Sequence, residues 1–227
     1  MLVVDTSSTI GQLVLWSKGA YIGHRLEGMR HGEQLLDSMR NLLRRAGIEL
    51  KQLDAIAVVN GPGSLTGIRL SCAVVQALAW TYNLPVVPLN SLLMLGWHKL
   101  CTTDGVLLMD ARMEHVYITS FCRGNWQGTE IAARHMPLNM VQTFLRRYSE
   151  QPKSFVNYYG NQDTLARLHE TGVSAEAVRP SLSSLAEYAM VKWCAGGSIP
   201  VASLEPNYLA LWAAQGHGQA IKHDHSS

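Results

Sequence analysis

The chain has 227 residues, a net charge of +2, and a composition that is 47% apolar and 16% charged. This length suits one large domain or two small ones with a substantial core, and the weak charge favours solvated helix faces over a nucleic-acid footprint. No apolar run approaches the roughly 18 residues that span a bilayer, so we expect no membrane segment. The four cysteines lack C-x-x-C spacing, which favours reduced thiols in the cytoplasm over zinc or disulfides.

The N-terminal segment predicts an antiparallel unit of three strands. An apolar strand ends at Asp5, a second strand runs to Trp16, and a third follows the turn at Lys18-Gly19. An amphipathic helix over residues 31–46 and a strand over residues 55–59 come next. The apolar stripe of this helix comprises Leu35, Met39, Leu42, Leu43 and Ala46, and Leu36 widens it.

A glycine-rich stretch, NGPGSLTGIR at residues 60–69, stands directly before a long apolar run. Backbone amides of a glycine-rich loop that opens a helix can bind phosphate. The nucleoside triphosphate version also carries a lysine after its last glycine, whereas Ile68 follows Gly67 here. The stretch therefore favours a turn whose backbone angles, rigidity and helix cap come from Gly61, Gly63, Pro62 and either Ser64 or Thr66.

The helix predicted over residues 67–82 has almost no polar side, because only Arg69, Ser71 and Gln76 interrupt its apolar residues from position 68 to 80. Such a helix is either enclosed by its own domain or covered on one side by another subunit. Arg69 and Gln76 are seven residues apart on one side of the helix, where they could mark the rim of an interface. The apolar run at residues 85–89 predicts a further strand.

The second half of the chain repeats the opening unit. In VLLMDARMEHVYITSFCRGNWQG a strand ends at Asp110, another strand reaches Cys122, and a turn follows at Arg123-Gly124. Asp5 precedes Gly19 by fourteen residues, and Asp110 precedes Gly124 by the same number. Strand, aspartate, turn, strand and basic-Gly turn recur in the same order, which indicates a duplicated unit.

Helices predicted over residues 138–148, 162–169 and 182–194, with a strand over residues 154–160, complete the second half. Antiparallel strands joined to strand–helix units imply mixed sheets with helices packed on them. We therefore expect an α/β protein with an N-terminal lobe over residues 1–103 and a C-terminal lobe over residues 104–215. Residues 216–227 are expected to be a flexible tail.

Together these segments resemble the bacterial TsaB (YeaZ) family, which is related to the Gcp/Kae1 family within the actin-like ATPase superfamily. The resemblance covers nearly the whole chain and rests on VVDTSS, RHGEQLL, NGPGSLTGIR, PVVPLNSLLML, MDARMEHVY and EPNYL. It implies a duplicated actin-like, ribonuclease H-like fold. It also implies a role in making N6-threonylcarbamoyladenosine at position 37 of tRNAs that read ANN codons.

The resemblance implies partners as well. Proteins of this family pair with the catalytic subunit TsaD, and TsaE and TsaC complete the pathway. We expect contact with tRNA through the complex, a homodimer as an alternative state of the isolated chain, and no cofactor of its own. The chain departs from the family pattern at Ala210, which follows EPNYL in place of arginine, and at Gln162, where a second glycine is common. The tail histidines His217, His223 and His225 favour a disordered end over a metal site.

Nucleotide-hydrolysing members of the superfamily bind phosphates with glycine-containing turns after the two aspartates. Here those turns read Asp5-Thr6-Ser7-Ser8 and Asp110-Ala111-Arg112, without glycine. The two aspartates could hold Mg²⁺ or simply cap strand-end turns. We therefore expect at most a vestigial nucleotide site, for which the candidate residues are Asp5, Ser7, Gly61, Gly63, Ser64 and Asp110.

A non-catalytic activating subunit is the preferred function. A sugar-kinase-like ATPase or phosphotransferase is the first alternative, opposed by the missing phosphate glycines. A metallopeptidase is the second, opposed because Leu35 stands one helical turn after His31 where a second metal ligand would be needed. No catalytic residue or metal site is expected. The predicted partner interface comprises His31, Leu35, Leu36, Met39, Leu42, Ile68, Arg69, Cys72, Val75, Gln76 and Ala79.

Overall fold

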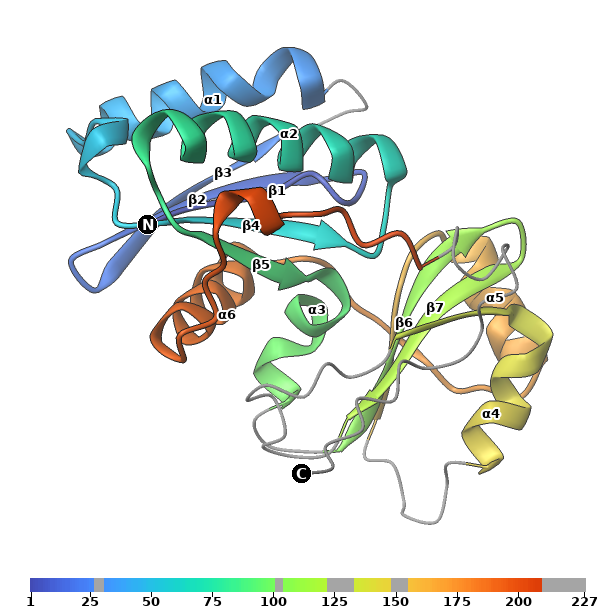
Figure 1. Cartoon of the computed structure of the whole chain (residues 1–227). Coiled ribbons are helices and arrows are strands. Elements are labelled where there is room, and N and C mark those ends of the chain that lie inside the picture. The colour runs from blue at the N-terminus through green and yellow to red at the C-terminus, as the bar shows by residue number, and fades with distance from the viewer. Residues whose placement is uncertain (27–30, 101–103, 122–132, 148–154, 210–227) are drawn as a thin grey trace, which may run out of the picture.

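The computed structural model of the chain describes residues 1–26, 31–100, 104–121, 133–147 and 155–209 and consists of two lobes, each built on a five-stranded sheet (Figure 1). The predicted Arg123-Gly124 turn, Ala210 and the tail over residues 216–227 lie outside the described residues. No helix in the part of the chain that the structure describes is long and apolar enough to cross a membrane.

The first sheet has the strand order β3-β2-β1-β4-β5. β1, β2 and β3 form an antiparallel meander, whereas β4 and β5 run parallel to β1. Helices connect the parallel strands, as parallel pairing requires. The strands span Leu2–Asp5 (β1), Gly11–Ser17 (β2), Ala20–Leu26 (β3), Ile56–Gly61 (β4) and Val86–Asn90 (β5).

The second sheet repeats this path. Its order is β10-β9-β6-β7-β8, with β6 antiparallel to β7 and parallel to β9, so that β6 takes the place of β1. Asp5 is the last residue of β1, and Asp110 lies two residues before the end of β6. The predicted duplicated actin-like α/β fold is confirmed. The strands span Gly105–Arg112 (β6), His115–Phe121 (β7), Arg134–Pro137 (β8), Phe155–Tyr159 (β9) and Glu176–Ala177 (β10).

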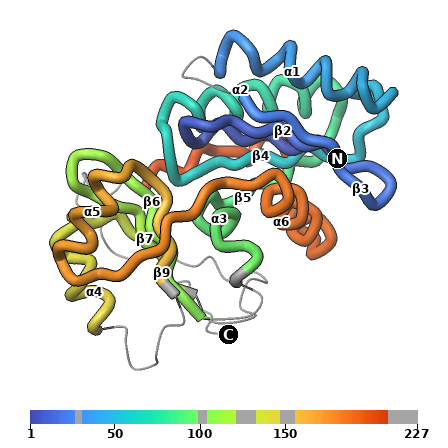
Figure 2. Tube along the Cα trace, turned by 180° about the vertical axis from the view of Figure 1, so that it is seen from behind, coloured from blue at the N-terminus to red at the C-terminus, as the bar shows by residue number. Residues whose placement is uncertain are grey.

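The helices form layers on both sides of each sheet (Figures 1 and 2). α1 and α2 cover the outer face of the first sheet, α4 and α5 cover the outer face of the second, and α3 and α6 lie between the sheets. α1 and α6 have the predicted bounds, whereas α3 was not predicted. The helices span His31–Ala46 (α1), Leu65–Tyr82 (α2), Ser91–Leu100 (α3), Val141–Arg147 (α4), Gln162–Glu170 (α5) and Leu182–Cys194 (α6).

The core between the sheets joins the two lobes. α3 follows the first sheet in sequence and packs on both sheets, through β4 and β5 of the first and β6 and β7 of the second. α6 follows the second sheet but packs on β1, β2, β3 and β5 of the first. Trp97 of α3 and Tyr188 of α6 meet with ring centroids 5.1 Å apart. β5 ends at residue 90 and β6 begins at residue 105, while α3 and α6 each pack on strands of the other half's sheet. The division into lobes at residue 103 stays a prediction.

Candidate functional site

The first candidate phosphate turn begins at the end of β1. Asp5 is fully buried, and its Oδ1 accepts hydrogen bonds from the backbone N–H of Ser7 (2.8 Å) and the Ser7 hydroxyl (2.6 Å). This is a side-chain-capped turn of the kind that aspartate forms with the residue two positions later. Burial raises the pKa of Asp5, while the bonds from Ser7 and the charge of His31 act in the opposite direction.

The glycine-rich stretch packs directly on this turn. Ser64 donates its backbone N–H to Ser7 O (2.7 Å), and the Thr6 hydroxyl donates to Gly67 O (2.6 Å). A Cβ added to Gly63 would overlap Ser7 O, and one added to Gly67 would overlap Thr6 O. The glycines therefore permit close approach of the chain to itself, so that protein backbone occupies the side of the turn facing these glycines.

The helix that follows begins as predicted. Ser64 is the N-cap of α2, and its hydroxyl accepts from Gly67 N (3.4 Å). Gly61 and Gly63 have φ angles of 126° and 153°, conformations that favour glycine. The interpretation of NGPGSLTGIR as a turn and helix start is confirmed in these respects.

Asp110 occupies the corresponding place in the second lobe. Its Oδ1 accepts from Arg112 N (2.8 Å) and its Oδ2 accepts from Asn161 Nδ2 (2.5 Å). Asn161 also caps α5 through its Oδ1, which accepts from Thr164 N (2.7 Å). Asp110 therefore caps a turn and ties it to the start of α5, and Gln162 stands exposed as the first residue of that helix.

Most side chains predicted to contact a partner are part of the first lobe's interior. The buried ones are His31, Leu35, Met39, Leu42, Ile68, Cys72, Val75 and Ala79. Their apolar members belong to the core cluster between the two helices and the sheet. These side chains support the helix pair from beneath and lie away from its exposed surface, and the partner interface itself stays a prediction.

Residues 199–208, here called the C-terminal strap, explain the roles of the two polar residues predicted at the interface rim. Gln76 Nε2 donates to Leu204 O (2.8 Å), and Arg69 Nε donates to the Tyr208 hydroxyl (3.0 Å). The Arg69 guanidinium also lies 5.3 Å from the centre of the Tyr208 ring. Both residues thus hold the chain's own C-terminal segment against α2.

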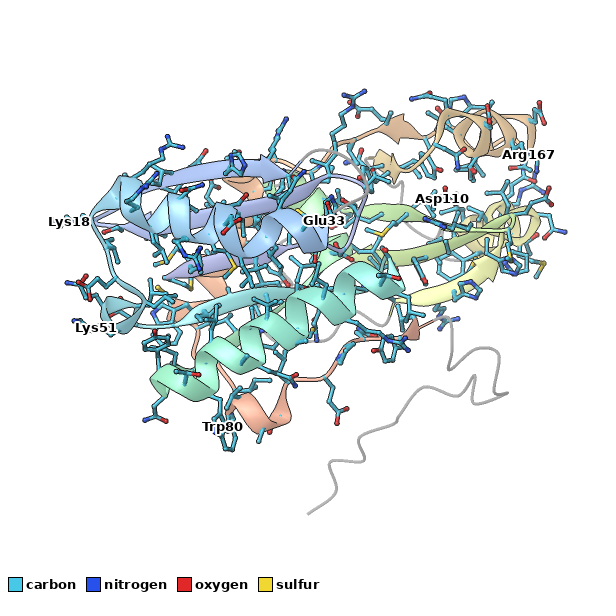
Figure 3. The ribbon with its side chains drawn as sticks, turned by 90° about the horizontal axis from the view of Figure 1, so that it is seen from above. Lys18, Glu33, Lys51, Trp80, Asp110 and Arg167 are labelled. Atoms are coloured by element: carbon cyan, nitrogen blue, oxygen red, sulfur yellow. The ribbon has the colours of Figure 1, made fainter. Side chains whose placement is uncertain are left out.

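The surface of α1 and α2 that remains accessible carries a different apolar set. Leu36 of α1 is 54% exposed and Trp80 of α2 is 73% exposed. Ala73 and Ala77 of α2 are exposed as well. Trp80 projects from α2 near its C-terminal end (Figure 3). We call Leu36, Ala73, Ala77 and Trp80 the α1–α2 surface.

The comparisons with known proteins agree with this architecture. The family model described as "TsaD: tRNA N6-adenosine threonylcarbamoyltransferase" matches residues 25–174. The chain is 26% identical over 219 residues to the tRNA threonylcarbamoyladenosine biosynthesis protein TsaB of Escherichia coli, covering 92% of this chain and 94% of that relative. The chain belongs to the TsaB (YeaZ) branch of this family.

Two further comparisons concern the fold of this TsaB-family chain and its likeness to the transferases. The solved structure of YeaZ from Pseudomonas aeruginosa has a TM-score of 0.73 and 24% identity, covering 92% of this chain and 98% of that one, and it supports the fold. The tRNA N6-adenosine threonylcarbamoyltransferase of Limosilactobacillus reuteri is 37% identical over 60 residues, which are 26% of this chain and 18% of that enzyme. The transferase is thus similar to this chain over part of its own length.

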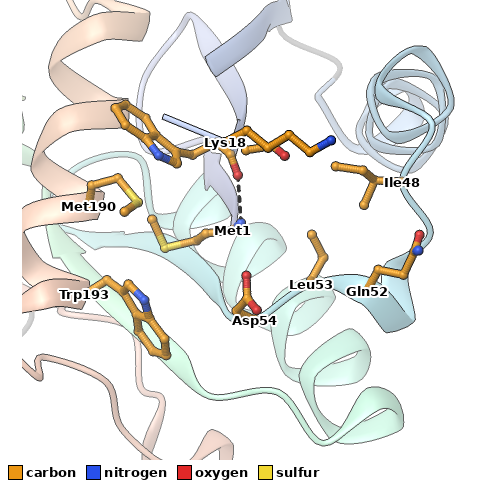
Figure 4. A pocket seen from close by; sticks show the side chains of 10 residues that line it. Met1, Lys18, Ile48, Gln52, Leu53, Asp54, Met190 and Trp193 are labelled. Atoms are coloured by element: carbon orange, nitrogen blue, oxygen red, sulfur yellow. Dashed lines mark hydrogen bonds between the residues drawn. The ribbon is translucent and has the colours of Figure 1, made fainter. Parts of the chain in front are cut away.

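This TsaB-family chain also has a cavity of about 300 Å³ away from both candidate phosphate turns (Figure 4). It lies beside Met1, at the opposite end of β1 from Asp5, where the Met1 amino group donates to Trp16 O (2.9 Å). Its remaining lining residues are Ser17, Lys18, Ile48, Gln52, Leu53, Asp54, Met190 and Trp193. The cavity is therefore distinct from the candidate nucleotide site.

The amino-acid sequence did not lead us to predict which apolar residues of α2 are exposed or which residue pairs with Arg69. Trp80 lies outside the stripe formed by Ile68, Cys72 and Val75, and a large apolar residue off the buried stripe is a usable signal of exposure. The pairing of Arg69 with Tyr208 joins residues 139 positions apart, and nothing in local periodicity indicates it.

Proposed function

We propose that this chain is a non-catalytic activating subunit that pairs with TsaD in the formation of N6-threonylcarbamoyladenosine on tRNA. Membership of the TsaB branch supports the pathway. The observation that carries the non-catalytic role is the packing of Gly63 and Gly67 on Ser7 and Thr6. A phosphate bound by this turn needs free backbone donors and room, and here the chain's own backbone takes up that room.

The same geometry argues against the two catalytic alternatives. An ATPase or phosphotransferase needs both phosphate turns, yet Asp110 is engaged by Arg112 N and Asn161 Nδ2. A metallopeptidase needs a cluster of ligands. Within the described residues, no group of three or more His, Cys, Asp and Glu side chains is placed to hold a metal ion. We therefore assign the reaction to the partner.

The α1–α2 surface supports the pairing. Leu36 of α1 and Trp80 of α2 are large exposed apolar residues, and α2 also exposes two alanines. Small residues along a helix let a second helix approach closely. Tryptophans at the centre of an interface often dominate its binding energy. Removing these apolar side chains from water by association would contribute about 25 cal/mol for each Å² buried. The surface therefore suits a helical partner with a complementary apolar face.

TsaD is the proposed occupant of this surface. The TsaD family model matches residues 25–174, which include the whole of α1 and α2. TsaD is accordingly expected to carry a similar helix pair, and two similar helix pairs can pack face to face much as two subunits do in a symmetric dimer. We also propose that TsaE joins this pair, that TsaC acts elsewhere in the pathway, and that tRNA binds through the complex. A second copy of this chain is the alternative occupant when TsaD is absent.

The proposal is tested by charging the exposed surface. Trp80→Glu should leave thermal unfolding nearly unchanged because the side chain is 73% exposed, and surface changes usually stay within about 0.5 kcal/mol. Binding to TsaD, measured by calorimetric titration, should weaken by at least about 30-fold, which corresponds to the roughly 2 kcal/mol of a hot-spot side chain. Leu36→Glu should act in the same direction.

Met140→Glu is the matched control, because Met140 is 51% exposed and lies in the second lobe. It should bind TsaD like the wild-type chain. If Trp80→Glu and Leu36→Glu both retain wild-type affinity, the proposed surface is wrong. If the wild-type chain does not bind TsaD at all, the proposed function fails with it.

A further inference from the structure

Two buried oxygen atoms on neighbouring strands of the first sheet lack hydrogen-bond partners among the residues that the structure describes. Asp5 Oδ2 is one of them, although Oδ1 of the same carboxyl group accepts twice from Ser7. Gln12 Oε1 is the other, although Nε2 of the same amide donates to Pro180 O (3.2 Å). Both side chains are fully buried. A buried polar atom left unpaired costs about 1–3 kcal/mol, so each one calls for a partner.

The strand register places these two groups together. Asp5 of β1 stands directly opposite Gln12 of β2 in the antiparallel pair. Side chains at opposed positions lie on the same face of the sheet, with Cβ atoms about 4.5–5.5 Å apart. Both orphan atoms are acceptors while Asp5 is ionised, so they cannot bond to each other in that state. A carboxylic acid O–H at Oδ2 would be a donor and would satisfy both atoms at once.

We propose that Asp5 is a neutral carboxylic acid in the folded chain at pH 7 and that its Oδ2–H donates to Gln12 Oε1. The proton fixes the turn after β1 to the neighbouring strand. It also removes the negative charge from the position where the fold resemblance would place a magnesium-associated aspartate. In this chain the aspartate holds a proton where a nucleotide-binding relative would use its charge.

The electrostatic surroundings favour this state. Burial, the largest influence, raises the pKa of Asp5, because a desolvated carboxylate is costly. His31, from the start of α1, is the titratable side chain whose charge opposes this shift. The other described neighbours of the Asp5 side chain are Ser7 in the turn and Gln12 on β2, and neither carries a charge.

The test compares Asp5→Asn with the wild-type chain by denaturant unfolding at pH 5, 6 and 7. The Asn amide can donate to Gln12 Oε1 as the acid does, but it does not titrate. A raised folded-state pKa means that wild-type stability is complete below the unfolded value near 3.8 and falls as pH rises toward the folded value. The folding constant of Asp5→Asn relative to wild type should therefore rise about tenfold per pH unit.

Asp110→Asn is the matched control, since both Asp110 oxygens accept bonds from the protein; its ratio to wild type should not rise in this way. A pH-independent Asp5→Asn ratio would overturn the proposal in favour of an ionised Asp5 paired with His31⁺ or a bridging water. Addition of Mg²⁺ should not stabilise the wild-type chain relative to Asp5→Asn, and selective stabilisation would also overturn the proposal.

A second measurement decides the matter if Asp5→Asn does not fold. The ¹³C resonance of the Asp5 carboxyl in the labelled wild-type chain should report the protonated form at pH 7. A transition to the ionised form with its midpoint below pH 7 would contradict the proposal whatever the variant does.

Discussion

The packing of the glycine-rich stretch on the first turn makes a sharp prediction for Gly67→Ala. Gly67 lies in the first turn of α2, and a Cβ there would overlap the backbone oxygen of Thr6. The turn cannot move away freely, because the Thr6 hydroxyl donates to Gly67 O (2.6 Å) and Ser64 N donates to Ser7 O (2.7 Å). Overpacking of this kind costs about 1–3 kcal/mol, and each lost hydrogen bond adds about 1 kcal/mol.

Gly32 provides the matched control in α1. Among the residues that the structure describes, a Cβ added to Gly32 would meet only Leu70 Cδ2 at 3.9 Å, an ordinary contact. Replacing a helical glycine by alanine gains up to about 1 kcal/mol, and that gain also offsets part of the cost at Gly67. We expect Gly67→Ala to be less stable than Gly32→Ala by about 2–4 kcal/mol.

The assay is thermal unfolding of the two variants beside wild type. For a chain of this size about 1 kcal/mol corresponds to roughly 2–4 °C, so the midpoints should differ by about 4–16 °C. Gly32→Ala should unfold at or above the wild-type temperature. Equal midpoints for the two variants would refute the packing of this loop on the first turn, and with it the main argument against phosphate binding.

Two further predictions concern α2. Val75→Glu places a charge at a fully buried position; we expect loss of cooperative thermal unfolding because a buried unpaired charge costs several kcal/mol, and a wild-type midpoint would show that Val75 is accessible. Burial raises the pKa of the Cys72 thiol to about 12, so the reactive thiolate is scarce and shielded at pH 8. Iodoacetamide should therefore modify exposed Cys194 but not Cys72 in the folded chain, as read by peptide mass spectrometry, and equal labelling would contradict the buried position.

The duplicated fold could be predicted because its signals are local. In the sequence, Asp5 and Asp110 each precede a basic-Gly pair by fourteen residues, and the helical periods over residues 31–46 and 182–194 give the bounds of α1 and α6. α3 was missed because it follows β5 without a loop and is apolar on nearly every side. The residue that could have indicated α3 is Asn90, because asparagine is a common helix cap. Its Oδ1 accepts a hydrogen bond from Leu92 N (2.9 Å).

The candidate site was harder to predict because its decisive contacts are distant in sequence. The apolar residues of α2 indicated a covered helix, but not that the sheet covers Val75 and the strap engages Gln76. In the sequence, the glycines of NGPGSLTGIR likewise indicated only a turn with unusual backbone angles. Their other role, room for the backbone of Ser7 and Thr6, depends on residues more than fifty positions away.

The central claim is that this chain supports a reaction that TsaD carries out. The most direct measurement is the yield of N6-threonylcarbamoyladenosine on tRNA in a reconstituted reaction with TsaC, TsaD and TsaE, with and without this chain. The account predicts strong product formation only when the chain is present, and loss of that stimulation with Trp80→Glu but not with Met140→Glu. Equal product formation without the chain would contradict the account.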